Sequence, residues 1–225
     1  MPATPRFELL AFWRTSATYR VRVAMNLKGL DAQERQINLD TGEQRSAAFL
    51  KINPLGAIPA LIDHAPDLSA TPITQSQAIL EYLEEVQPTP PLLPADAHGR
   101  ARVRSLAAML AADTHPLITG RIKKYLVAHA GFDEAAFRAW QIHWITTGLQ
   151  AVEARLASEP ATGVYCHGQT ISMADIVLAS IVVVVRAFKI VVVDIPTIDR
   201  IVGLCEKHEA FAKAAPLAQP GAPQG

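Results

Sequence analysis

Two hydroxylated residues, Thr15 and Ser16, stand directly before an amphipathic run that carries Arg20 and Arg22. The apolar run 7–12 predicts a buried strand, and the apolar residues after Ser16 recur at helical spacing. A hydroxyl at the start of a helix lies beside the positive end of the helix dipole, where it can stabilise an anion. The same hydroxyls suit an ordinary N-cap, and we interpret the two arginines as solvated or paired with carboxylates.

Cysteine and histidine residues form no pattern typical of a metal site. The two cysteines, Cys166 and Cys205, are far apart and outside CxxC or zinc spacing, and the seven histidines are scattered. We therefore expect no structural metal and no disulfide, which fits a reducing cytoplasm. The adjacent Cys166 and His167 leave a cysteine nucleophile open as an alternative.

The chain has 225 residues and no net charge, because 21 Lys and Arg residues balance 21 Asp and Glu residues. A balanced chain lacks the field that holds nucleic acid or an anionic membrane, so any anion site must be local. The apolar run 176–185 has about half of the ~20 residues needed to cross a bilayer, and the first dozen residues lack a signal peptide's apolar region. We expect a cytoplasmic protein that binds neither nucleic acid nor membrane.

Hydrophobic patterning places the candidate residues on a small α/β domain followed by a helical one. Strands are expected at 7–12, 33–39 and 57–63, with a weaker one at 68–73, and helices at 46–52 and within 74–86. Four prolines within residues 87–94 predict an extended linker. The predicted domains are therefore residues 1–87 and 95–225, joined by the linker 88–94.

In the helical domain, long helices are expected at about 99–130 and 133–157, with shorter ones to about residue 215. The valine-rich segment 180–193 favours a strand on propensity alone. Ser172 and Asp175 before it form a capping box, which favours a buried helix. We adopt the helix and keep a β-hairpin as the alternative.

The stretches NPLGAIPALID and ITQSQAILEYLEE, the proline-rich linker and ISMADI resemble, in this order, the cytosolic glutathione S-transferases. RTSATYRVRVAMNLKG and DTHPL are more specific and resemble the zeta class, which contains maleylacetoacetate and maleylpyruvate isomerases. The resemblance runs from about residue 7 to residue 216. It implies an α/β N-terminal thioredoxin-like domain that binds glutathione, an all-α C-terminal domain, a homodimer, and a loop position for Cys166.

The resemblance also implies a set of glutathione contacts. In the family, the residue before a cis-proline pairs its backbone with the cysteinyl backbone of the tripeptide, and a Gln-Ser pair at a helix start binds the γ-glutamyl carboxylate. One further contact comes from the first domain and one from the helical domain. The corresponding positions in this chain are Gln44, Ile58, Pro59, Gln75, Ser76 and His115.

The thiol of glutathione, with a pKa of about 8.5, is mostly protonated at neutral pH unless its surroundings favour the thiolate. Thr15 and Ser16 occupy the first two places of the zeta-class Ser-Ser-Cys motif, which implies that one of them stabilises the thiolate, and Ala17 replaces the cysteine. The loss of that cysteine disfavours dehalogenation through a protein–glutathione disulfide. It is compatible with an isomerase in which the sulfur of glutathione adds to a conjugated cis double bond and departs after rotation.

Such an isomerase needs cationic groups for a small dianionic keto acid, and arginine binds carboxylates with its bidentate fork. The resemblance implies that Arg14, Arg121 and Arg186 bind the substrate. Arg186 lies one place before the arginine of the family, a change of about 100° around a helix. Thr119 stands where an asparagine is common.

The expected function is therefore a glutathione-dependent cis–trans isomerase of maleylacetoacetate or maleylpyruvate in the catabolism of aromatic compounds. Two alternatives remain. One is a general transferase that conjugates glutathione to small electrophiles or dehalogenates them, and the other is a noncatalytic binding module with the same fold.

Overall fold

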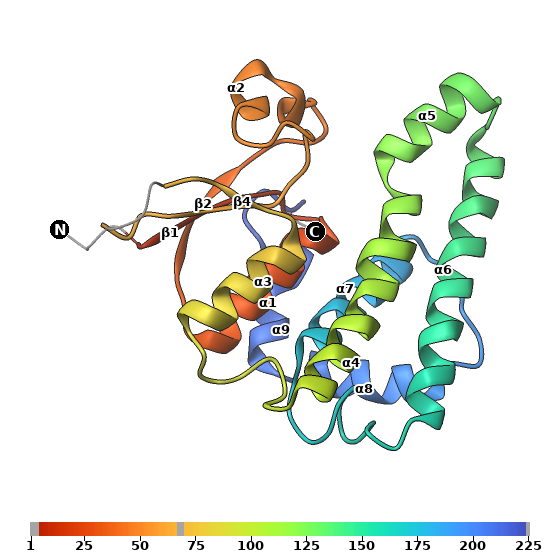
Figure 1. Ribbon diagram of the computed structural model, residues 1–225. Coiled ribbons are helices and arrows are strands. Elements are labelled where there is room, and N and C mark those ends of the chain that lie inside the picture. The colour runs from red at the N-terminus through yellow and green to blue at the C-terminus, as the bar shows by residue number, and fades with distance from the viewer. Residues whose placement is uncertain (1–4, 67–69, 224–225) are drawn as a thin grey trace. The chain divides into compact units, whose positions relative to one another are not determined.

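The computed structural model of the protein describes residues 5–66 and 70–223 (Figure 1). The chain forms two compact units, one made of residues 1–91 and 207–225 and the other of residues 92–206. The division at residue 91 falls inside the proline-rich segment. Residues 207–225 group with the first unit, whereas the expected helical domain included them.

A four-stranded sheet with the order β2-β1-β3-β4 lies at the centre of the first unit. Its strands are β1 (Phe7–Ala11), β2 (Ala32–Gln36), β3 (Ala60–Asp63) and β4 (Ile73–Thr74). β1 pairs parallel with β2 and antiparallel with β3, which pairs antiparallel with β4. The predicted α/β order is confirmed. The weak strand predicted at 68–73 is observed only at its end, and residues 68 and 69 lie outside the described residues.

Helices cover both faces of this sheet. α1 (Ser16–Lys28) and α3 (Ser76–Val86) lie side by side on one face, and the short α2 (Ala47–Leu50) lies on the other (Figure 1). α1 ends at Gly29, whose left-handed backbone, with φ 63°, makes a glycine C-cap. Because both faces are covered, the loop between β1 and α1 starts and ends on elements fixed by a packed core.

The helix α9 (Glu209–Ala214) returns to the first unit and packs against α1. The rings of Tyr19 and Phe211 meet edge to face with their centroids 6.5 Å apart, and both side chains are buried. The side-chain amide of Asn26 donates a hydrogen bond to the carbonyl of Ala210 at 2.9 Å. The sequence predicted a helix in this region but not its packing partner, which lies 184 positions away along the chain.

Asp63, the last residue of β3, is a buried carboxylate held by three donors. Arg6 Nη2 and the hydroxyl of Tyr82 each lie 2.6 Å from its Oδ2, and the backbone N–H of Ala65 donates to its Oδ1 at 2.8 Å. Burial alone would raise the pKa of Asp63, but these hydrogen bonds outweigh burial and hold the pKa at about 2. The ionised carboxylate therefore stabilises the folded chain.

This carboxylate should make the free energy of unfolding depend on pH in the acid range. The stabilisation from Asp63 is complete above the unfolded-chain pKa of about 3.9, and it is lost as the pH falls towards about 2. We expect a loss of about 1–2 kcal/mol, because the half-exposed side chain of Arg6 is screened by solvent. Urea unfolding across this range measures the effect.

Asp63→Asn should remove this part of the pH dependence. Asp31→Asn, a change at an exposed carboxyl between α1 and β2, serves as the control and should leave it in place. An Asp63→Asn protein with the acid sensitivity of the original chain would contradict the assignment.

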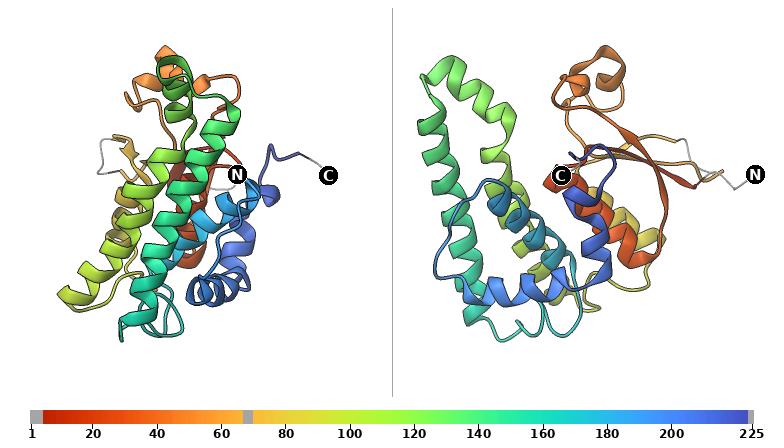
Figure 2. Two further views of the ribbon diagram at one scale, coloured as in Figure 1. Left: turned by 90° about the vertical axis from the view of Figure 1, so that its right-hand side faces the viewer. Right: turned by 180° about the vertical axis from the view of Figure 1, so that it is seen from behind.

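The second unit is all helical, as predicted. Its helices are α4 (Ala97–Ala108), α5 (Gly120–Ala130), α6 (Glu134–Ser158), α7 (Met173–Ala187) and α8 (Pro196–Glu206). α7 packs against α4 and α8, and α6 packs against α8 and the turns that follow α4 (Figure 2). Within residues 5–66 and 70–223, every helix is too short or too polar to span a bilayer.

The valine-rich segment divides into a helix and a loop. Ser172 and Asp175 form both halves of the predicted capping box at the start of α7, which continues to Ala187. The helix prediction is therefore confirmed for the first part of the segment and the β-hairpin is wrong, whereas residues 190–195 form a loop. Most residues of α7 are buried, so helical packing overrides the strand propensity of valine.

The long helix predicted at 99–130 is interrupted between α4 and α5. Met109–Thr114 form a π-helical turn and His115–Ile118 a 3₁₀ turn. Thr114 Oγ1 donates a hydrogen bond to the carbonyl of Met109, five residues earlier, at 2.8 Å. A π-helical turn holds one more residue than an α-helical turn, so it changes the angular position of His115 around the helix axis.

Gly148→Ala is expected to destabilise the second unit by about 1–3 kcal/mol, the usual effect of overpacking. A Cβ at position 148 of α6 would lie 2.1 Å from Oγ1 and 2.8 Å from Cγ2 of Thr114, which is buried and cannot withdraw. Gly203→Ala on α8 is the matched control, since nothing lies within 4 Å of its added Cβ. Urea unfolding compares the two variants, and equal stabilities would show that Thr114 does not need the space above Gly148.

Candidate functional site

Thr15 and Ser16 lie at the junction of β1 and α1, as predicted. Thr15 has the backbone conformation of an N-cap, with φ −84° and ψ 130°, but its side chain makes no capping hydrogen bond. Its Oγ1 instead lies 2.6 Å from Oγ1 of the fully buried Thr18. Ser16 is buried and Thr15 is half-buried, so the hydroxyl of Thr15 is the more accessible of the two. The first turn of α1 holds no acidic side chain that would neutralise the helix dipole.

A second helix start, that of α3, follows β4. Gln75 is the N-cap residue, with φ 71° and ψ 116°, a backbone conformation that L residues rarely adopt. Its side chain makes no capping hydrogen bond, and the first turn of α3 contains no acidic residue. The N–H groups and the positive dipole end of α3 therefore favour an anion at this point.

Two arginines of α1 are buried rather than solvated. Arg20 is 2% exposed, and its Nη1 donates a hydrogen bond to Oγ of Ser76, the first residue of α3, at 3.2 Å. Burial lowers the pKa of Arg20 to about 10, so the side chain remains cationic at neutral pH. Arg22 makes two hydrogen bonds to Glu34, at 2.7 and 2.8 Å. The carboxylate pairing expected for these arginines is confirmed for Arg22, whereas the solvated alternative is wrong for both.

The loop before β3 presents Ile58 next to a cis peptide bond with Pro59. The strand pairing of β3 begins at Ala60, so the backbone of Ile58 lies outside the paired ladder. The side chain of Asn53 anchors this loop by donating a hydrogen bond to the carbonyl of Ala57 at 2.6 Å. A backbone held outside the ladder in this way can pair with an extended peptide.

Gln44 lies in the 3₁₀ turn Glu43–Arg45. Its Oε1 is buried and has no hydrogen-bond partner among the described residues. An unsatisfied buried acceptor costs about 1–3 kcal/mol. This oxygen is therefore suited to a donor that a ligand brings.

The three arginines predicted to bind substrate are all exposed. Arg14 pairs with Asp40, and its guanidinium lies 5.3 Å from the centroid of the Phe12 ring. In the second unit, Arg121 lies in the first turn of α5. Arg186 lies in the last turn of α7 and pairs with Glu206.

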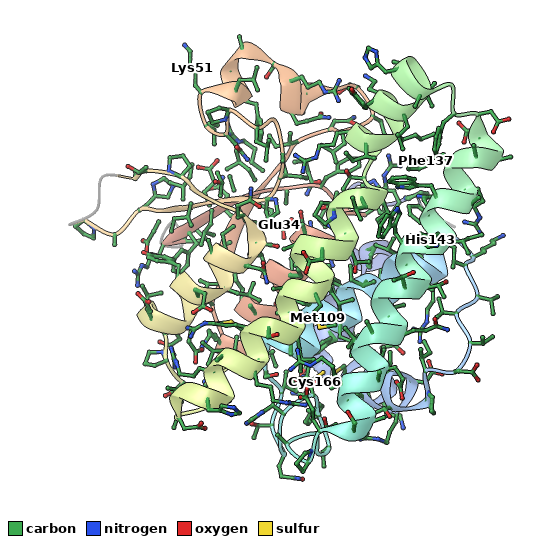
Figure 3. All side chains as sticks on the ribbon, turned by 45° about the vertical axis from the view of Figure 1, so that its right-hand side comes forward. Glu34, Lys51, Met109, Phe137, His143 and Cys166 are labelled. Atoms are coloured by element: carbon green, nitrogen blue, oxygen red, sulfur yellow. The ribbon has the colours of Figure 1, made fainter. Side chains whose placement is uncertain are left out.

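His115, the predicted glutathione contact of the second unit, is half-buried and begins the 3₁₀ turn after the π-helical turn. Thr119, which replaces the usual asparagine, is the N-cap residue of α5, and its hydroxyl donates to the carbonyl of Pro116 at 2.9 Å. Met109, where the π-helical turn begins, is labelled in Figure 3.

Cys166 does not have the environment of a nucleophile. It is buried in the loop before α7 (Figure 3), and burial raises the pKa of its thiol well above the usual range. Its backbone N–H donates to Oδ1 of Asp175 at 2.7 Å, which fixes the loop to the capping box. The cysteine alternative is therefore wrong. In the part of the chain that the structure describes, no three His, Cys, Asp or Glu side chains gather as metal ligands would.

Sequence reasoning missed three residues that shape the site: Thr18, Arg20 and Asn53. Thr18 lies three positions after Thr15, a spacing that brings side chains together on a helix. Arg20 lies three and four positions before the buried Val23 and Ala24, which places it on the buried side of α1. Both signals are present in the sequence, whereas the contact that Asn53 makes depends on the shape of its loop.

Comparisons with known proteins identify the family of the chain. The family model for the glutathione S-transferase N-terminal domain matches residues 5–85. The maleylpyruvate isomerase of Ralstonia sp. is 43% identical over 213 residues, which cover 95% of this chain and 98% of that protein. The maleylacetoacetate isomerase of Pseudomonas aeruginosa is 38% identical over 218 residues, which cover 96% and 99%. The chain therefore belongs to the glutathione S-transferase family.

Solved structures show to which class of the family the chain belongs. A maleylpyruvate isomerase described as a bacterial zeta-class enzyme shares 42% identity and a TM-score of 0.89, over 96% of this chain and all of that one. The maleylacetoacetate isomerase of Methylobacterium extorquens AM1, solved with malonate and glutathione, shares 41% identity and a TM-score of 0.91, with the same coverage. Within the family, the chain is a zeta-class member, as its motifs predicted.

Proposed function

We propose that this protein is a glutathione-dependent cis–trans isomerase of a maleyl keto acid, maleylpyruvate or maleylacetoacetate. The observation that carries the proposal is the start of α1. There the hydroxyl of Thr15 is not used for capping and stands at a helix end without acidic residues. The isomerase relatives that align over nearly the whole chain support the same reaction.

The first unit fits glutathione at three points. The unsatisfied Oε1 of Gln44 suits an N–H of the tripeptide. The backbone of Ile58, held by Pro59, suits the backbone of its cysteinyl residue. The start of α3, with Gln75 and Ser76, suits its γ-glutamyl carboxylate. These are the contacts that the family resemblance implies, and His115 of the second unit completes the proposed set.

Glutathione, when bound, supplies the sulfur nucleophile that adds to the conjugated cis double bond and leaves after rotation about the carbon–carbon bond. The hydroxyl of Thr15 donates a hydrogen bond to the sulfur, and this bond favours the thiolate over the thiol. In the structure the hydroxyl of Thr15 donates to Oγ1 of Thr18 at 2.6 Å. When glutathione binds, this proton turns to the sulfur, and the hydroxyl of Thr18 can then donate to Thr15 Oγ1. The positive end of the α1 dipole and the buried hydroxyl of Ser16 lie at the same helix start and also favour the thiolate.

Arginine side chains bind the two carboxylates of the substrate and stabilise the negative charge that develops on its carbonyl oxygen. We assign this role to Arg14, Arg121 and Arg186, of which Arg14 and Arg186 must exchange their carboxylate partners for the substrate. A relative from Anaeromyxobacter dehalogenans, 32% identical, was solved with dicarboxyethyl glutathione and citrate. Dicarboxyethyl glutathione carries a four-carbon dicarboxylate on its sulfur. The carbon–sulfur bond in that molecule is of the kind that the proposed addition forms.

We also propose that the protein is a cytoplasmic homodimer and acts in the catabolism of aromatic compounds. We propose that the linker 88–94 joins the glutathione-binding domain, residues 1–87, to the helical domain, residues 95–225. Light scattering of the purified protein tests the dimer.

The function is tested by following the absorbance of maleylacetoacetate and maleylpyruvate with the protein, with and without glutathione. The expected result is isomerisation that requires glutathione, while a thiol titration shows that glutathione is not consumed. Stoichiometric loss of glutathione with haloacids or aryl halides, without isomerisation, would identify a general transferase instead. Glutathione binding without turnover of any of these substrates would identify a noncatalytic module.

A further inference from the structure

Arg14, which the proposed function assigns to a carboxylate of the substrate, already faces a carboxylate of its own chain. Its Nη2 donates a hydrogen bond to Oδ1 of Asp40, a residue of the loop that follows β2. The guanidinium also lies 5.3 Å from the centroid of the Phe12 ring and 5.8 Å from that of Trp13. Asp40 therefore occupies the cation that an incoming carboxylate needs.

The loop that carries Asp40 is held in shape by hydrogen bonds of its own. The backbone N–H of Asp40 donates to Oδ1 of Asn38 at 2.9 Å, and the N–H of Thr41 donates to the same oxygen at 3.3 Å. The carboxylate of Glu43 accepts from the backbone N–H of Asn38 at 2.8 Å. None of these bonds uses the carboxylate of Asp40, so its charge can be removed without unravelling the loop.

The contact between Arg14 and Asp40 is of a kind that a ligand can replace. Arg14 uses one nitrogen for it, whereas a guanidinium can hold a carboxylate through two parallel hydrogen bonds. The two side chains are 50% and 55% exposed, so water screens their attraction. A substrate carboxylate that meets the guanidinium with both oxygens gains a hydrogen bond that Asp40 does not make.

We propose that Asp40 competes with the substrate for Arg14 and so sets the affinity of the site for carboxylates. This inference rests on the proposed function, in which Arg14 binds the substrate. Before binding, Asp40 neutralises the guanidinium. When the substrate takes the guanidinium, the carboxylate of Asp40 is released to water but stays close on its ordered loop, where it repels the negative charge of the substrate.

The test measures the KM of whichever maleyl keto acid the protein isomerises, at saturating glutathione. Asp40→Asn should lower this KM about two- to fivefold, the range of an exposed ion pair, and leave kcat and the Kd of glutathione within about twofold. Asp31→Asn removes the same charge from an exposed position between α1 and β2 and should leave the KM unchanged. Added salt should reduce the difference between Asp40→Asn and the original protein.

A double-variant cycle separates competition for Arg14 from a general change in charge. Asp40→Asn should raise kcat/KM about two- to fivefold while Arg14 is present, and hardly at all in the Arg14→Gln protein. An equal gain in both backgrounds would overturn the proposal, because the carboxylate of Asp40 would then act on the substrate without Arg14.

An unchanged KM in Asp40→Asn would also overturn the proposal. A higher KM would do the same, since it would show that Asp40 positions Arg14 for the substrate. These failures leave the proposed function intact, because the isomerisation is still observed. A protein that isomerises neither keto acid refutes the proposed function and this inference together.

Discussion

Thr15→Val is expected to raise the pKa of the bound glutathione thiol by about 1–2 units and to lower turnover at neutral pH about ten- to a hundredfold. Valine keeps the shape of threonine but has no proton to donate, so the thiolate loses a charge-assisted hydrogen bond. Each unit of increase in the pKa reduces the fraction of thiolate about tenfold once the pKa lies above the working pH. The ultraviolet absorbance of the thiolate, followed against pH, measures the shift directly.

Three further variants separate the possible sources of this effect. Thr18→Val removes the partner that lies 2.6 Å from Thr15 Oγ1, and should shift the thiol pKa in the same direction by a smaller amount. Thr15→Ser keeps the hydroxyl and should restore the original value. If Thr15→Val leaves the pKa unchanged while Ser16→Ala raises it, the stabilising hydroxyl is that of Ser16.

Lys28→Met is expected to lower the free energy of unfolding by about 3–5 kcal/mol, the usual effect of breaking a buried ion pair from one side. The side chain of Lys28, the last residue of α1, is completely buried, and its Nζ lies 2.7 Å from Oε2 of Glu84 on α3. The ammonium also donates to the carbonyls of Gln87 and Pro90, at 2.6 and 3.0 Å. Its removal takes the opposite charge and one hydrogen bond from the buried carboxylate of Glu84, and one donor from each of the two carbonyls.

The double variant Lys28→Met, Glu84→Met should recover part of this loss, because no charge is then left buried. Lys213→Met on α9 is the matched control. Its partner Glu209 is exposed and four residues away on the same helix, so solvent screens the pair and the free energy of unfolding should hardly change. Urea unfolding of the three proteins tests these values, and similar losses for Lys28→Met and Lys213→Met would show that burial adds nothing to the pair.

The order of elements in the first unit could be predicted because each leaves a local signal. The apolar run of β1, the glycine that ends α1 and the alternation of β2 are patterns of neighbouring residues. The capping box of α7 identified a helix inside a valine-rich segment that propensity alone would make a strand. The same box could not show where α7 ends, since the turn after Ala187 depends on how the following loop packs.

Features that arise from contacts between distant residues were not predictable. The π-helical turn Met109–Thr114 depends on the space that Gly148 leaves on α6, and no periodicity in the sequence marks it. The residues implied by the family resemblance fall at helix ends, in short 3₁₀ turns and in loops. Whether Arg14 and Arg186 pair with acidic residues, as they do here, depends on side chains far along the chain.

The return of α9 to α1 sets the order in which a newly made chain can complete its core. Tyr19 and Asn26 leave the ribosome early, but Phe211 and Ala210, which cover them, are made almost two hundred residues later. The first unit therefore stays incomplete during most of synthesis, with an apolar strip of α1 uncovered. A fragment that stops at residue 91 would keep the sheet but lack this part of its core, so it should be soluble only if residues 207–214 are supplied to it.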